Sequence, residues 1–147
     1  MPKPFSSDAR IERIARGLID RSLPRSEWTH AGHFAAVTWL LRHRGNEAVR
    51  HSMPQWIRDY NEVNGVANTD TGGYHETITQ ASIRAAHSVL AAHADDDPLH
   101  EVLNVLLSGE FGRSDWVLRY WSRARLFAPE ARRGWVDPDV RPLPFQA

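Results

Sequence analysis

The chain has 147 residues, no cysteine and only two methionines. Without cysteine, disulfide bonds, thiolate metal ligands and thiol nucleophiles are excluded. The 18 basic and 18 acidic side chains leave a formal net charge of zero, so no overall positive field attracts nucleic acid or an anionic membrane. No apolar run approaches the roughly 18 residues of a membrane span, and the first residues lack the apolar core of a signal peptide. We therefore expect a cytoplasmic protein with neither a nucleic-acid nor a membrane partner.

Apolar residues recur at helical spacing along the chain, and no strand-length segment alternates apolar with polar residues. The sequence therefore predicts an all-α, up-down bundle of five or six helices in one domain, residues 1–147. Its core covers about 7–127, and an extended, proline-rich tail at 128–147 docks on that core. The expected helices end near Pro24, cover about 29–44, 46–60, 74–94 and 99–108, and include a last one capped by Ser114.

Three residues add detail to this helical prediction. Pro54 lies inside the third expected helix, so we expect a break or kink there, because proline has no N–H to donate within a helix. Asp97 precedes Pro98 and is expected to cap the fifth helix. Trp39 lies off the inward stripe of Val37 and Leu41, so it should pack in a second interface, against the first helix or the tail.

Eight histidines and six tryptophans are the unusual part of the composition. His30 and His33 extend the buried stripe of the second expected helix, and His75 extends that of the fourth. In an up-down bundle these two helices run parallel and begin at the same end. We therefore expect the three imidazoles to converge there, beside the loop 64–73. Burial and a helix N-terminus both favour the neutral imidazole, which binds a metal or accepts a proton.

Polar residues near the same end complete the predicted site. Glu76 is a candidate general base or fourth metal ligand, and Asp70 is the alternative carboxylate for that role. Tyr60, Asn61, Asp70 and Thr79 are candidate substrate-binding residues, because each is expected within reach of the histidines.

Three functions fit this pattern. The first is a small metalloenzyme or metal-binding protein that acts on a small organic molecule, with Zn²⁺ or Fe²⁺ held by His30, His33 and His75. The second is a metal-free enzyme in which a neutral histidine, His75, and Glu76 act as base and acid. The third is a non-catalytic helical module that binds a ligand or a partner through an aromatic-lined groove. A homodimer is compatible with each of them.

Several motifs resemble an uncharacterised family of small bacterial helical proteins. They are Trp28-Thr29-His30-Ala31-Gly32-His33, Gly73-Tyr74-His75-Glu76-Thr77-Ile78-Thr79 and, near the end, Tyr120-Trp121-Ser122 and Trp135-Val136-Asp137-Pro138. The likeness covers about residues 26–144. It implies a shared role for His30, His33, His75 and Glu76 but supplies no reaction, and Pro54 departs from the unbroken third helix that it implies.

A looser similarity links the chain to the DinB-like four-helix proteins, whose bundles hold a divalent metal on three histidines. The spacing here does not reproduce their H-x-x-x-H helix, so the similarity is one of architecture only.

Overall fold

A computed structural model describes residues 5–145 of the chain. Its five long helices are α1 (Asp8–Asp20), α2 (His30–Arg44), α3 (Asn46–Val63), α4 (Glu76–Ala91) and α5 (Leu99–Ser108). Shorter elements join them or follow them: η1 (Arg25–Glu27), η2 (Glu110–Gly112), η3 (Trp116–Arg119), α6 (Arg123–Leu126) and α7 (Pro129–Arg133). The part of the chain that is described contains no strand, which confirms the all-α prediction. None of its helices is long and apolar enough to cross a lipid bilayer.

The helix α2 lies at the centre and packs against α1, α3, α4 and α5. Residues 34–41 of this helix are all buried. A helix that is buried on every side has no solvent-facing stripe. The buried surface of α2 is therefore wider than the single inward stripe that the sequence predicted. Trp39 packs against α1, where the Arg16 guanidinium lies 5.2 Å from the centre of its ring, and this confirms the prediction of a second interface.

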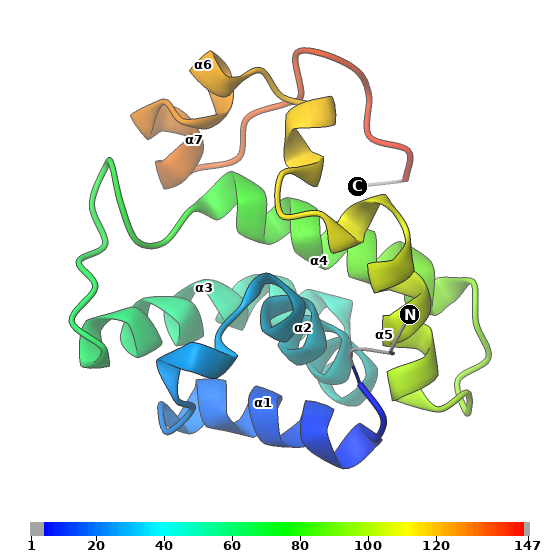
Figure 1. The fold of residues 1–147 in the computed structure, drawn as a ribbon. Helices are drawn as coiled ribbons and strands as arrows, with labels where there is room; N and C mark the ends of the chain where they lie inside the picture. The colour runs from blue at the N-terminus through cyan, green and yellow to red at the C-terminus, as the bar shows by residue number, and fades with distance from the viewer. Residues whose placement is uncertain (1–4, 146–147) are drawn as a thin grey trace.

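The helix α3 continues through Pro54, so the predicted break is wrong. Proline cannot donate the usual hydrogen bond to the carbonyl four residues earlier, which here belongs to Arg50. That carbonyl instead accepts a hydrogen bond from Gln80 Nε2 of α4 at 3.0 Å. The neighbouring helix therefore satisfies the carbonyl that proline leaves free. Figure 1 shows α3 and α4 side by side and running in opposite directions.

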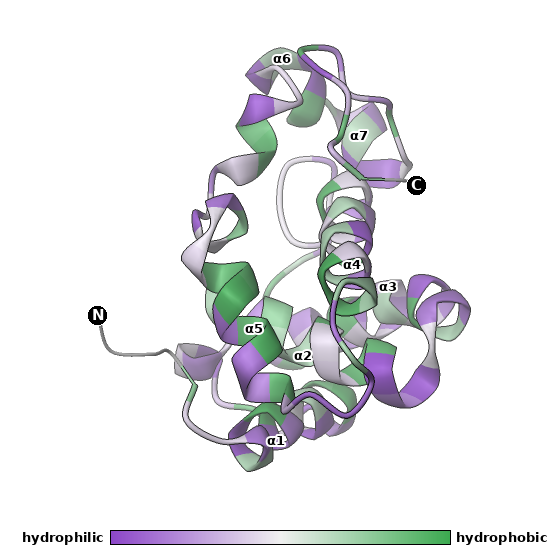
Figure 2. Cartoon of the chain, turned by 90° about the vertical axis from the view of Figure 1, so that its right-hand side faces the viewer, coloured by the Kyte–Doolittle hydropathy of each residue, from purple (hydrophilic) through white to green (hydrophobic). Residues whose placement is uncertain are grey.

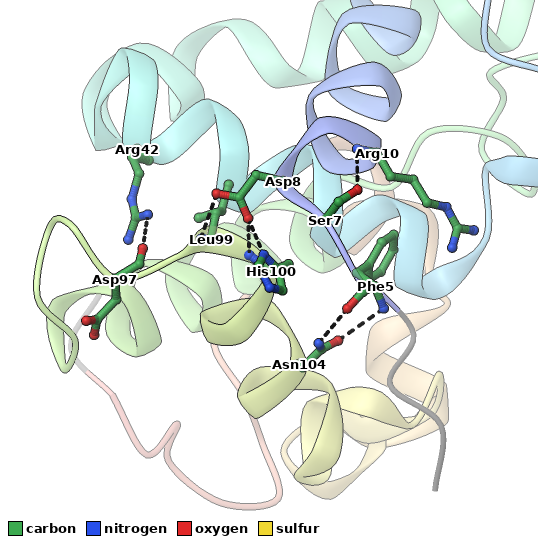
Figure 3. Close-up of polar contacts among 9 residues, drawn as sticks. All are labelled: Phe5, Ser7, Asp8, Arg10, Arg42, Asp97, Leu99, His100 and Asn104. Atoms are coloured by element: carbon green, nitrogen blue, oxygen red, sulfur yellow. Dashed lines mark hydrogen bonds and ion pairs between the residues drawn. The ribbon is translucent and has the colours of Figure 1, made fainter.

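The start of α5 is held by a residue from the other end of the chain. The Asp8 carboxylate accepts hydrogen bonds from the backbone N–H groups of Leu99 at 3.1 Å and His100 at 2.8 Å, and it also contacts the His100 ring (Figure 3). Asp8 is therefore the cap that the sequence assigned to Asp97. In Figure 2 much of α5 has the colour of hydrophobic residues, and its Leu99 and Leu103 are buried.

After α5 the chain departs from the expected pattern. The helix predicted after Ser114 is only the 3-10 turn η3, and the tail begins with α7 instead of being extended from residue 128. Both α6 and α7 lie on the side of α4 that faces away from α3 (Figure 1).

The segment that follows α7 is docked on α4 and on Trp121, which precedes α6, through hydrogen bonds. The Thr77 hydroxyl lies 2.8 Å from the carbonyl of Ala131 and 2.9 Å from that of Gly134, and it accepts a hydrogen bond from the Val136 N–H at 3.2 Å. The Trp121 indole donates to the Val136 carbonyl at 3.0 Å. These contacts fix the course of the chain around Trp135.

Candidate functional site

His30 and His75 have hydrogen-bond partners in different elements of the fold. The His30 Nε2 atom lies 2.7 Å from the Phe111 carbonyl in η2, whereas His75 Nε2 lies 2.7 Å from the Leu126 carbonyl in α6. Figure 1 shows that α2 and α4 cross instead of running parallel, so their first turns do not meet at one end as predicted. Among residues 5–145 no group of three or more His, Asp or Glu side chains is placed to hold a metal ion. Metal binding by His30, His33 and His75 stays a prediction.

His75 has both ring nitrogens in use. It is the N-cap of α4, not part of its first turn, and its Nδ1 accepts a hydrogen bond from the Ile78 N–H at 3.1 Å. The proton therefore resides on Nε2, which donates to the Leu126 carbonyl. Burial lowers the pKa of His75 despite that carbonyl, so the ring stays neutral. In this arrangement both ring nitrogens of His75 form hydrogen bonds that join the start of α4 to α6.

His33 is half-buried beside Trp28, with 5.2 Å between the ring centres. No hydrogen bond to its ring nitrogens is present among the described residues. Burial, together with the nearby His30, lowers the pKa of His33 to about 4. The ring is therefore neutral at pH 7, in line with the sequence-based expectation.

Tyr60 and Asn61 hold the C-terminal end of α3 against neighbouring segments. The buried Tyr60 hydroxyl donates to the Leu23 carbonyl at 2.8 Å, which ties α3 to the segment after α1. The Asn61 amide donates to Asn68 Oδ1 at 3.0 Å, and the same oxygen accepts from the Tyr74 N–H. Both predicted substrate-binding residues are thus committed to anchoring neighbouring backbone and the loop 64–73.

Asp70 and Thr79 also have structural partners. The Asp70 carboxylate forms a bidentate ion pair with Arg133 of α7, with Arg133 Nε at 2.8 Å. Thr79 is buried next to the Tyr74 hydroxyl. Neither residue faces the pocket that contains Glu76.

Glu76 is the predicted site residue that faces open space. It begins α4, and its Oε1 accepts a hydrogen bond from the Tyr74 hydroxyl. Burial, reinforced by Glu76, strongly raises the pKa of Tyr74, so this hydroxyl keeps its proton. Glu76 lines an open pocket of about 660 Å³, which we call the α3–α4 pocket; its other lining residues are Asn46, Glu47, Arg50, His51, Gln80, Arg84 and Trp135.

One wall of the α3–α4 pocket is an arginine stacked on a tryptophan. The Arg84 guanidinium lies 3.7 Å from the centre of the Trp135 ring, and its buried Nε has no hydrogen-bond partner among residues 5–145. Trp135 is itself held, because its indole donates to Asp137 at 3.0 Å and its ring packs edge-on against Trp121. Next to this wall, the buried Gln80 Oε1 also lacks a partner within the described chain.

The charges of the pocket are not paired with one another. In the described part of the chain, neither Arg50 nor Arg84 has a carboxylate at ion-pair distance. Burial and the neighbouring Arg50 lower the pKa of Arg84, while Asp137 acts in the opposite direction. The pocket therefore holds two guanidinium groups that repel each other.

Sequence reasoning found Glu76 but missed the rest of the pocket. A usable signal was present in α4, where Glu76, Gln80 and Arg84 follow one another at intervals of four and so share one face. A line of charged and amide side chains on one face of a helix predicts a polar groove. Trp135 could not be assigned in this way, because its position depends on the course of the docked segment.

Comparison with known proteins brings no identification for this arrangement. No family model, no curated protein and no solved structure matches the chain. The likeness to the uncharacterised bacterial family and to the DinB-like proteins therefore stays a prediction, and the function has to be inferred from the pocket itself.

Proposed function

We propose that the protein binds a small organic molecule in the α3–α4 pocket and transfers a proton to or from it through Glu76. The observation that carries this proposal is the lining of the pocket, in which Glu76 and two arginines surround open space while the buried Arg84 Nε and Gln80 Oε1 beside it have no protein partner within residues 5–145. Small-molecule sites are usually concave, with volumes of roughly 300–1,000 Å³, and a few precisely placed polar groups orient the ligand.

Glu76 is well placed for acid–base chemistry. Its carboxylate stands at the start of α4, where the helix dipole stabilises negative charge. The Tyr74 hydroxyl holds one carboxylate oxygen, which orients the group and leaves the other oxygen for a substrate proton. His51 of α3 lines the same pocket and is exposed, so an imidazole is at hand as the complementary acid or base. His51 thus takes the part that the sequence assigned to His75.

The experiment has two stages. Small molecules that raise the melting temperature are identified first, and proton transfer is then followed by NMR as exchange of ligand hydrogen for deuterium from the solvent. We expect Glu76→Gln to bind the ligand but to slow exchange by about 10²–10⁴-fold, the range of a general base. The matched control is Glu62→Gln, on an exposed position at the far end of α3. Exchange at the wild-type rate in Glu76→Gln would overturn the proposed role of this residue.

A further inference from the structure

The two arginines of the α3–α4 pocket, Arg50 and Arg84, lie close together without a carboxylate partner among the described residues. Arg84 is half-buried on α4 and Arg50 is half-buried on α3. The two helices are tied together at this point, because Gln80 Nε2 donates to the Arg50 carbonyl. Each guanidinium therefore has a fixed place in the same pocket, and bringing two cations together in a partly buried site is unfavourable unless an anion joins them.

The acidic residues nearby do not supply that anion. Within residues 5–145 Glu76 forms no ion pair with either arginine, and Asp137 accepts from the Trp135 indole. Glu47 lines the pocket and is exposed, but it forms no ion pair with any residue in the described range 5–145. The guanidinium edges of Arg84 and Arg50 are left for a ligand.

We infer that the ligand of the α3–α4 pocket carries a carboxylate that binds Arg50 and Arg84, an inference that rests on the proposed function. Beside the carboxylate, the ligand carries a hydrogen-bond donor that binds Gln80. A carboxylate matches the planar fork of a guanidinium. The Trp135 ring covers one face of Arg84 and leaves its edge for such a contact. The unpaired Gln80 Oε1 is an acceptor, so the matching ligand group is an amino or hydroxyl group.

The balance of charge favours a carboxylate over a phosphate. Two arginines and two glutamates, Glu47 and Glu76, line the same pocket. A phosphate carries close to two negative charges at neutral pH and would be repelled by both glutamates, whereas a carboxylate carries one. The chemical class is therefore a small 2-hydroxy or 2-amino carboxylic acid.

The test measures binding of lactate and L-alanine by NMR shifts of the tryptophan indole signals, at constant ionic strength. Two amides test the need for the carboxylate: lactamide, which is neutral, and alaninamide, which keeps the ammonium group of alanine but has no negative charge. Propionate tests the need for the donor, and inorganic phosphate tests the rival anion. We expect the two acids to shift a single indole signal, which Trp135→Phe removes, and to bind more tightly than their amides, propionate or phosphate. Tighter binding of phosphate, or equal binding of the amides, would overturn the inference.

Variants locate the anion. Arg84→Met and Arg50→Met should each weaken binding about tenfold or more, the usual loss when a charge-assisted hydrogen bond is removed. Arg44→Met is the matched control, because Arg44 is exposed and stacks on Trp56 at 5.4 Å outside the pocket. If Arg84→Met fails to fold by circular dichroism, Arg84→Lys replaces it; lysine keeps the charge but not the fork, and we again expect a loss of about tenfold. Wild-type affinity in these pocket variants would overturn the inference.

The outcomes separate this inference from the proposed function. Carboxylate binding that depends on both arginines, without any effect of Glu76→Gln on proton exchange, supports the inference and rejects the acid–base role. Proton exchange that depends on Glu76 in a ligand without a carboxylate rejects the inference and supports the acid–base role.

Discussion

The neutral imidazole of His33 should make the folded protein sensitive to mild acid. Burial and the nearby His30 lower the pKa of His33 from 6.5 to about 4. In the unfolded chain the ring takes up a proton near pH 6.5, whereas in the folded protein it does so only near pH 4. Between these values the unfolded state binds more protons, so the free energy of unfolding decreases as the pH falls.

The size of the effect follows from the same two pKa values. One pKa unit corresponds to about 1.4 kcal/mol, so His33 alone should remove about 3 kcal/mol of stability between about pH 6.5 and about pH 4. This is a large part of the roughly 5–15 kcal/mol that stabilises an ordinary domain.

Urea denaturation at a series of pH values tests this prediction. His33→Gln cannot take up a proton, so its stability should depend less on pH than that of the wild type. The control is His43→Gln, which removes an exposed histidine stacked on Trp39 at the other end of the same helix. Parallel pH profiles for the wild type and His33→Gln would show that this reasoning is wrong.

Three further predictions concern stability. Thr77→Val removes the hydroxyl that accepts from the Val136 N–H and bonds to the α7 segment, so urea denaturation should show a loss of about 1–3 kcal/mol; an unchanged value would mean that the segment is held by other contacts. Gly73→Ala should cost at least about 1–2 kcal/mol, because Gly73 has a φ of 78° and a Cβ would lie 2.4 Å from the Ala67 carbonyl; thermal melting at wild-type temperature would contradict this. Burial raises the pKa of Asp8, but hydrogen bonds from the start of α5 outweigh it and the net pKa is lowered, so Asp8→Asn should lose less than about 1 kcal/mol at neutral pH. This difference should shrink as the pH falls below 3.8, the usual pKa of the group, and a difference independent of pH would refute it.

Local signals in the sequence predict much of the helical structure. The helix α2 begins after Thr29, whose hydroxyl accepts from the Gly32 N–H at 3.0 Å, and it ends at Gly45, as helix-cap rules require. The bounds of α5 follow in the same way from Pro98 and Gly109. Such elements can be predicted because the residues that start and stop them are adjacent in the sequence.

Features that depend on distant partners could not be predicted in this way. The cap of α5 is Asp8, which lies 91 residues before Leu99. The predicted convergence of the histidines depended on a feature of the same kind, the relative direction of α2 and α4, and periodicity does not determine how two helices cross. Glu76 was found because it lies on α4 itself, whereas Trp135 reaches the pocket through the docked segment.

The hydrogen bond between Gln80 and the Arg50 carbonyl has a consequence for evolution. A proline inside a helix ordinarily destabilises it by about 3 kcal/mol or more. Here the carbonyl that loses its usual donor accepts a hydrogen bond from an amide of another helix. In a homologue with any other residue at position 54, the backbone N–H of that residue would also donate to this carbonyl, which would then no longer depend on the Gln80 amide. Positions 54 and 80 should therefore change together among descendants of a common ancestor, although they lie 26 residues apart. A substitution at position 80 would be tolerated or rejected according to whether position 54 is proline.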